Sequence, residues 1–183
     1  MDLLFVSMIV LNIGCLAAFQ WGRRCYFRRP NEDRIRGGLG PLGTAFAIVQ
    51  LPLVWLGGVY SNDLLVGVVV VLYLLSLLLF YWTTRSHNQR RPGIAFTHGA
   101  PEALVTSGAY QVARHPFYLS YLLFWAGVAV VAPFFLGLPI LAVMGVLYFR
   151  TGRQEEMDII LSPLGSDYKK YRSRVGMFFR WPR

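Results

Sequence analysis

One short segment in the last half of the chain combines residue types that can bind an anion. It reads Arg114-His115-Pro116-Phe117-Tyr118. Proline is favoured at the first position of a helix, because its missing N–H would be unpaired there anyway, so we expect a helix to begin at Pro116 with His115 as its cap. The free N–H groups and positive dipole end of such a helix suit a ligand carboxylate. We expect His115 and Tyr118 to lie at an exposed helix start. The alternative is that Arg114 and His115 anchor the chain at a membrane surface, with Tyr118 in the aromatic belt.

A second candidate segment lies further along the chain and is rich in carboxylates, tyrosines and cations. Glu155 and Glu156 are adjacent, and adjacent residues do not share a helix face, so we expect only one of them to point inward and favour Glu156. Tyr168, Tyr171 and Arg174 are spaced by three residues, a pattern that can place them on one helix face. The alternative is an amphipathic tail that rests on anionic lipid.

The elements that position these segments are apolar helices. The chain has 183 residues, of which 55% are hydrophobic and 15% charged, with a mean hydropathy of +0.46, which is too apolar for a soluble domain of this length. Runs of roughly 20 apolar residues can cross a bilayer as helices. The sequence therefore predicts a single-domain, all-α integral membrane protein over 1–183, with five spans at about 3–21, 44–60, 63–82, 117–132 and 134–149. The last two form a hairpin that reverses near Ala132-Pro133.

The distribution of charge predicts the orientation of these spans. Lysine and arginine number 18 against 9 acidic residues, and the cations fall between the first two spans, after the third and after the fifth. With five crossings these regions share one side, so we expect the N-terminus outside and the segments 85–116 and 150–183 in the cytoplasm. Anionic lipid headgroups are the expected acidic partner, and nucleic acid is not expected.

Several other classes of function lack support in the sequence. No glycine-rich dinucleotide or phosphate loop and no nucleophile motif is present, and His87 and His98 have no metal-ligand spacing, so no metal site is expected. Cys15 and Cys25 are likewise uninformative about function.

The two candidate segments together resemble a known family. The similarity is carried by Leu-Val-Thr-Ser-Gly-x-Tyr at 104–110, Arg-His-Pro-x-Tyr at 114–118, the apolar hairpin, Glu155-Glu156 and Gly-x-x-Tyr-x-x-Tyr-x-x-Arg-Val at 165–175. In this order and at these distances they resemble the isoprenylcysteine carboxyl methyltransferase family of integral membrane enzymes. The compact length is similar to that of prokaryotic members, which implies a bacterial or archaeal cell membrane.

This resemblance implies an S-adenosylmethionine-dependent methyltransferase with its cofactor pocket at the cytoplasmic side. It implies that His115, Tyr118 and a glutamate of the Glu155-Glu156 pair hold the cofactor and that Arg174 lies near the substrate. The residues of the two segments add further candidates. Cofactor binding is expected from Gly108, Tyr110, His115, Pro116, Tyr118, Glu155 and Glu156; substrate binding from Arg114, Tyr168 and Tyr171; and catalysis from Arg174, Glu156 and Arg150.

The methyl acceptor stays open at this point. A lipophilic molecule that enters from the bilayer is expected, and a prenylcysteine-like carboxylate would already be nucleophilic at neutral pH. A phospholipid amine and a small thiol or quinone-like molecule are alternatives within the enzyme class. A different class is a small membrane adaptor or channel-like subunit whose basic cytoplasmic face binds lipid or a partner. Its weakness is that the predicted membrane hairpin regions are nearly uncharged, so no residues mark an ion path.

Overall fold

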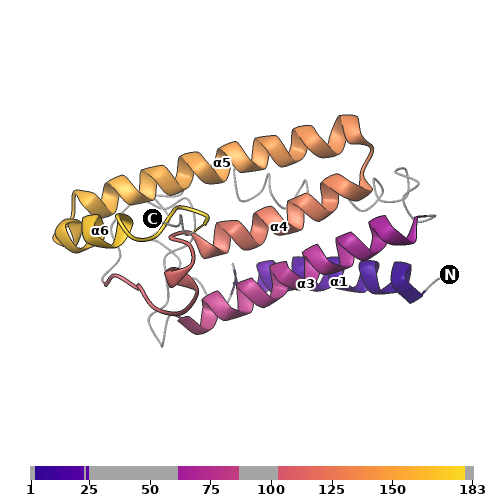
Figure 1. Ribbon diagram of the computed structural model, residues 1–183, viewed down its shortest axis with the longest axis horizontal. Coiled ribbons are helices and arrows are strands. Elements are labelled where there is room, and N and C mark those ends of the chain that lie inside the picture. The colour runs from indigo at the N-terminus through magenta and orange to yellow at the C-terminus, as the bar shows by residue number, and fades with distance from the viewer. Residues whose placement is uncertain (1–2, 23, 25–61, 87–102, 180–183) are drawn as a thin grey trace.

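The protein is a bundle of helices. The computed structural model describes residues 3–22, 24, 62–86 and 103–179. Its elements are α1 (Leu3–Trp21), α3 (Asp63–Ser86), the 3₁₀ helix η4 (Gly108–Gln111), α4 (Pro116–Val131), α5 (Phe134–Ile160) and α6 (Gly165–Arg172) (Figure 1). The described ranges contain no strand, and the expected all-α fold is confirmed. The predicted span at 44–60 lies outside the described residues, as do His87, His98 and Cys25.

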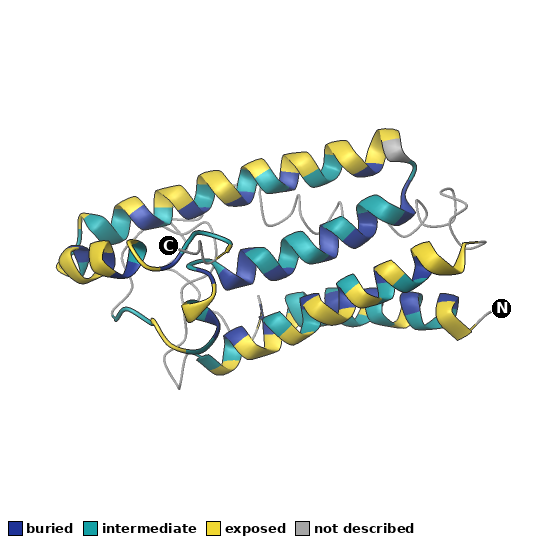
Figure 2. Ribbon diagram, in the orientation of Figure 1, coloured by how far each residue is buried: buried dark blue, intermediate teal, exposed yellow. Residues whose placement is uncertain are grey.

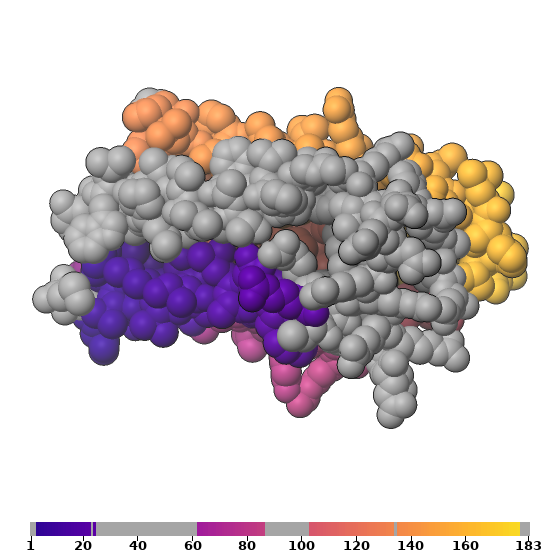
Figure 3. All heavy atoms as spheres, turned by 180° about the vertical axis from the view of Figure 1, so that it is seen from behind, coloured from indigo at the N-terminus to yellow at the C-terminus, as the bar shows by residue number. Residues whose placement is uncertain are grey.

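Helix α4 lies at the centre of the described bundle. It packs against α3 on one side and α5 on the other, and α1 packs against α3 (Figure 1). From behind, α1 crosses one face, while α5 lies along one edge and α6 at one end (Figure 3). Dark, buried residues line α4, whereas α5 turns a long exposed side outward (Figure 2). The start of α4, which carries the first candidate segment, is therefore held between other elements.

Close contacts between helices explain this packing. A side chain at Gly127 of α4 would come within 2.5 Å of the Tyr73 ring of α3, so the absence of a side chain lets the two helices approach. Polar groups in the same layer are paired: the Asn12 amide donates to the Tyr73 hydroxyl at 2.9 Å, and the Ser76 hydroxyl donates to the carbonyl of Ser120 at 2.8 Å. These bonds satisfy groups that would be costly to leave unpaired in an apolar interior.

Three of the described helices are long and apolar enough to cross a membrane: α1, α3 and α5. Helix α4 has 16 residues and is about 24 Å long, which is shorter than a hydrocarbon core of about 30 Å. The outward faces of the long helices expose large aliphatic side chains, among them Val10, Ile13, Val71, Leu78 and Val146. Each of these helices has an apolar stretch without charged residues, and exposed apolar faces on such stretches fit a lipid environment, which supports a membrane protein.

Two helices extend beyond the membrane spans predicted for them. Helix α3 continues to Ser86 rather than ending at 82, and α5 continues to Ile160 rather than 149. In the last turn of α3, the hydroxyls of Thr83 and Ser86 donate to the carbonyls of Leu79 and Trp82 and are thus paired within the helix. The stretch after 149 is polar but rich in good helix formers, so the helix outlasts its apolar part. Hydropathy locates the edge of the membrane, whereas helix propensity and packing decide where a helix ends.

The hairpin between α4 and α5 matches its prediction. Helix α4 ends at Val131 and α5 begins at Phe134, so the chain reverses at Ala132-Pro133 as expected. A Cβ at Gly137 would lie 2.7 Å from the carbonyl oxygen of Ala129, so the two helices are in close contact just beyond the turn.

Candidate functional site

The candidate site lies where the start of α4 meets the C-terminal half of α5, α6 and the segment 173–179 (Figure 1). Helix α4 begins at Pro116 with His115 as its N-cap residue, as the sequence predicted. The backbone N–H groups of Arg114 and His115 donate to the carbonyls of Gly176 and Met177, both at 3.0 Å. The C-terminal segment is thus bonded directly to the residues that precede α4.

The His115 side chain lies between two carboxylates. Its Nδ1 is 3.5 Å from Glu155 Oε2, and its Nε2 is 3.3 Å from Glu156 Oε1. Both glutamates therefore face the same imidazole, and the expectation that only one would point inward is wrong. The reason is Gly152, one turn earlier on α5, where a Cβ would lie 3.3 Å from two atoms of the ring. Without a side chain there, the ring approaches the helix closely enough for adjacent side chains to reach it from either side.

Glu156 is the buried member of the pair. Its side chain is 1% exposed, and its Oε1 accepts a hydrogen bond from Arg114 Nε at 2.9 Å. Burial by itself would raise the pKa of Glu156, but the contacts with His115 and Arg114 outweigh it and hold this pKa below its ordinary value. Glu156 Oε2 is buried and accepts no hydrogen bond from the residues that the structure describes, and Arg172 Nε lies 3.8 Å from it.

Glu155 is half-buried and contacts Tyr118. The Tyr118 hydroxyl donates to Glu155 Oε1 at 2.5 Å. The Tyr118 ring stacks on His115, with centroids 5.4 Å apart, and on Tyr148 of α5, with centroids 5.2 Å apart. The His115 side chain is 10% exposed and Tyr118 only 4%, so the expectation of an exposed helix start is wrong. Helix α5 and the C-terminal segment cover both residues.

Arg114 fastens three parts of the protein together. Besides its contact with Glu156, its Nη1 donates to the carbonyls of Val175 at 2.8 Å and Arg172 at 3.3 Å. Its side chain is 10% exposed. These contacts hold the C-terminal segment against α5 and the start of α4, and the expected contact of Arg114 with substrate stays a prediction.

Three of the expected tyrosines, Tyr110, Tyr168 and Tyr171, lie together in an apolar cluster beside Glu156. The cluster contains Tyr168, Tyr171 and Val175, with Leu104, Tyr110, Ile159 and Ile160 packed against it. The Tyr171 hydroxyl donates to the carbonyl of Tyr110 at 2.6 Å. Burial first, and then the nearby Glu156 carboxylate, raise the pKa of Tyr168. The cluster joins the segment before α4 to α6 and keeps both close to the glutamates.

Gly108 has a conformational role. Its φ of +60° lies in the left-handed region, and a Cβ there would come within 2.2 Å of Ser86 Oγ. The same hydroxyl accepts the backbone N–H of Ala109 at 2.9 Å. Gly108 thus lets the chain before η4 pack on the end of α3, and its expected contact with a cofactor stays a prediction.

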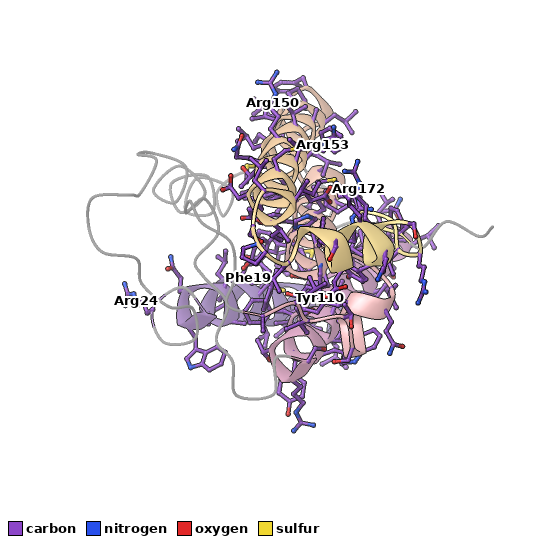
Figure 4. All side chains as sticks on the ribbon, turned by 90° about the vertical axis from the view of Figure 1, so that its left-hand side faces the viewer. Phe19, Arg24, Tyr110, Arg150, Arg153 and Arg172 are labelled. Atoms are coloured by element: carbon purple, nitrogen blue, oxygen red, sulfur yellow. The ribbon has the colours of Figure 1, made fainter. Side chains whose placement is uncertain are left out.

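The two other arginines expected to act in catalysis lie on the surface. Arg150 is exposed on α5 and lies toward the outer edge of the molecule in Figure 4, while Arg174 is exposed beyond the end of α6. Tyr168 and Tyr171 are buried, so the expected shared face with Arg174 is wrong, because the helix ends at Arg172 before that residue. Arg172, and not Arg174, lies close to Glu156.

Sequence reasoning missed Arg172, Gly152 and the backbone of 176–177. A glycine inside an otherwise helical stretch often has a packing reason, so this pattern could have identified Gly152. No comparable pattern distinguishes Arg172 from the cations around it.

Comparisons with known proteins add no further assignment. A scan against protein-family models, a search of curated proteins and a search of solved structures each found no match to this chain. Within the described residues, no group of three or more histidine, cysteine, aspartate and glutamate side chains has the arrangement of a metal site.

Proposed function

We propose that this protein is a membrane methyltransferase that uses S-adenosylmethionine and is related to the isoprenylcysteine carboxyl methyltransferases. The observation that carries the proposal is the convergence of its two motif segments. His115 and Tyr118, from one segment, directly contact Glu155 and Glu156, from the other. Residues that are far apart in the sequence thus form one polar cluster at the end of an apolar bundle.

The cluster fits the cationic part of this cofactor. When bound, S-adenosylmethionine supplies an electrophilic methyl group on a positively charged sulfonium, and it also carries an ammonium group. Glu156 Oε2 is a buried acceptor without a hydrogen-bond donor among the described residues, and such an atom favours a ligand N–H. Glu155, beside it, adds a second carboxylate. The N–H groups of Arg114 and His115, just before α4, already donate to protein carbonyls, so they do not serve a ligand carboxylate, and the expected role of the first turn of α4 in binding one stays a prediction.

The chain's own residues orient this acceptor and exclude water. Arg114 fixes the Glu156 carboxylate through Oε1 and leaves Oε2 to face a ligand. Tyr118 fixes Glu155 by donating to it, while His115 spans both side chains. Methyl transfer is an in-line displacement that needs no acid catalyst at the methyl group. Positioning and exclusion of water therefore provide most of the acceleration.

The surroundings of the cluster favour a lipophilic acceptor and a location at the cytoplasmic face. Exposed cations lie near the same end of the bundle: Arg150, Arg153, Lys169, Lys170 and Arg174. These exposed cations attract anionic headgroups. Lysine and arginine are also enriched on the cytoplasmic side of membrane proteins. The N-terminus then lies outside the cell, and the acceptor reaches the cluster from the bilayer. A prenylcysteine-like carboxylate is the leading acceptor of the proposal.

A methyl-transfer screen tests the proposal. Purified protein in liposomes is given S-adenosylmethionine with a labelled methyl group and one of three acceptors: an N-acetylated farnesylcysteine, phosphatidylethanolamine or a small alkyl thiol. We expect label in one acceptor class, a loss of transfer in Glu156→Gln, and near wild-type transfer in Asp167→Asn, because Asp167 on α6 is 69% exposed. Calorimetry that detects no binding of S-adenosylmethionine by the wild-type protein would favour a non-enzymatic membrane adaptor instead.

A further inference from the structure

The two arginines beside Glu156 differ in their exposure and in the hydrogen bonds that they donate to the protein. Arg114 is 10% exposed and donates to Glu156 and to two backbone carbonyls. Arg172 is 37% exposed, and its Nε lies 3.8 Å from Glu156 Oε2, which is beyond hydrogen-bond distance. Among the described residues, the partner of the Arg172 side chain is Glu156, through this ion pair. Its guanidinium therefore keeps donors for another group.

We propose that Arg172 binds a ligand carboxylate at the exposed edge of the cluster. The inference rests on the proposed function, because it takes the cluster to be the cofactor site. Two carboxylates repel an anion, so an anionic ligand group needs a cation that is both close and accessible. Arg172 meets both conditions, since it reaches Glu156 and is partly exposed. A planar guanidinium can also donate two parallel hydrogen bonds to one carboxylate.

The position of Arg172 favours it over the arginine that the sequence pointed to. Arg172 is the last residue of α6, and the same helix carries the buried Tyr168 and Tyr171, which fix its orientation. Arg174 is exposed, follows the end of the helix, and makes no ion pair with Glu155 or Glu156. Figure 4 shows Arg172 beside α6, whereas Arg150 lies farther out along α5.

The carboxylate has two possible sources, the amino-acid part of S-adenosylmethionine and the methyl acceptor. Two matched ligand pairs distinguish them. S-adenosylmethionine is compared with its decarboxylated form, and N-acetylated farnesylcysteine is compared with its carboxamide. Binding of each probe is measured by calorimetry in detergent for the wild type, Arg172→Gln, Arg172→Lys, Arg174→Gln and Arg153→Gln. Arg153 is the matched control because it is an exposed arginine on α5.

We expect Arg172→Gln to weaken binding of one carboxylate probe by roughly tenfold to a hundredfold, with its uncharged counterpart unaffected. Arg172→Lys should lose less, because it keeps the charge but not the planar fork. Arg153→Gln and Arg174→Gln should keep wild-type affinities. A loss confined to S-adenosylmethionine assigns the carboxylate to the cofactor, and a loss confined to the farnesylcysteine assigns it to the acceptor.

Two results would overturn the assignment of Arg172. One is an Arg172→Gln protein that retains both carboxylate preferences, and the other is an equal loss of preference in Arg174→Gln. Methyl transfer by the wild type, measured separately, tests the proposed function. If transfer occurs while Arg172→Gln keeps both preferences, Arg172 is wrongly assigned and the function stands. If no transfer occurs while Arg172→Gln loses the farnesylcysteine preference, the function fails and the carboxylate site stands.

Discussion

Gly152 provides a direct test of how the candidate site is built. A Cβ at this position would lie 2.5 Å from Met177 Cε and 3.3 Å from two atoms of the His115 ring. A Cβ at Gly145, on the same helix, would lie 3.9 Å from one Leu122 atom, which is an ordinary contact. Gly145→Ala therefore gains the helix stabilisation of alanine over glycine, about 0.5–1 kcal/mol. Gly152→Ala gains the same amount but must displace Met177 and shift His115.

Overpacking of a core costs about 1–3 kcal/mol, and the lower end applies here because Met177 Cε is the free end of a flexible side chain and the His115 ring must move only slightly. We therefore expect the free energy of unfolding of Gly152→Ala to lie about 1 kcal/mol below that of Gly145→Ala, measured by guanidinium denaturation in mild detergent. Binding of S-adenosylmethionine, measured by calorimetry, should weaken only in Gly152→Ala, because His115 is moved from its place between the glutamates. Equal stabilisation of the two variants with unchanged cofactor affinity would refute the close approach of His115 to α5.

Three further predictions concern the glutamates and the orientation of the chain. The lowered pKa of Glu156 means that its stabilising effect is complete above the unfolded-state pKa of about 4.3 and is lost as pH falls through the folded-state value. The difference in unfolding free energy between the wild type and Glu156→Gln should thus shrink below about pH 4.3 in denaturation curves, and a constant difference would contradict this. Tyr118→Phe keeps the ring but removes the donor to Glu155, so stability should fall by about 1–2 kcal/mol and cofactor affinity should weaken; wild-type values for both would argue against the bond. Cysteines introduced at Asn62 and Ser173 should be labelled by an impermeant reagent from outside and inside respectively, and labelling from one side only would contradict five spans.

The sequence predicted the apolar helices and the start of α4 well because both depend on local chemistry. Runs of aliphatic residues mark α1 and α3, and the proline at 116 marks the first turn of α4. The failures share a different cause. The burial of Tyr118 and the position of Arg172 depend on which elements pack together, and that information is spread over distant parts of the chain.

The Glu pair shows this dependence most clearly. Adjacent helical residues point in directions about 100° apart, so a partner at the usual distance from a helix meets only one of them. Sequence periodicity therefore argued for one inward carboxylate. At Gly152 the partner instead lies against the helix surface, and a ring in that position is reached by both side chains. Periodicity in the sequence predicts the direction of each side chain, whereas Gly152 shortens the distance between the His115 ring and α5.

The two glutamates of the site differ in their charged neighbours and in their exposure. Arg114 neutralises the buried Glu156 at 2.9 Å, and Arg172 lies at 3.8 Å from the same carboxylate. Glu155 Oε2 lies 3.5 Å from His115 Nδ1, its Oε1 accepts a hydrogen bond from the Tyr118 hydroxyl, and its side chain is 29% exposed. Glu155 is therefore the carboxylate of the pair that is nearer to solvent, and under the proposed function a cationic ligand group would meet it first. Glu156 lies deeper, with its Oε2 ready to accept a hydrogen bond once the ligand has entered. Under the proposed function, the ammonium group of the cofactor would lie between the two carboxylates, and a ligand carboxylate would lie at Arg172.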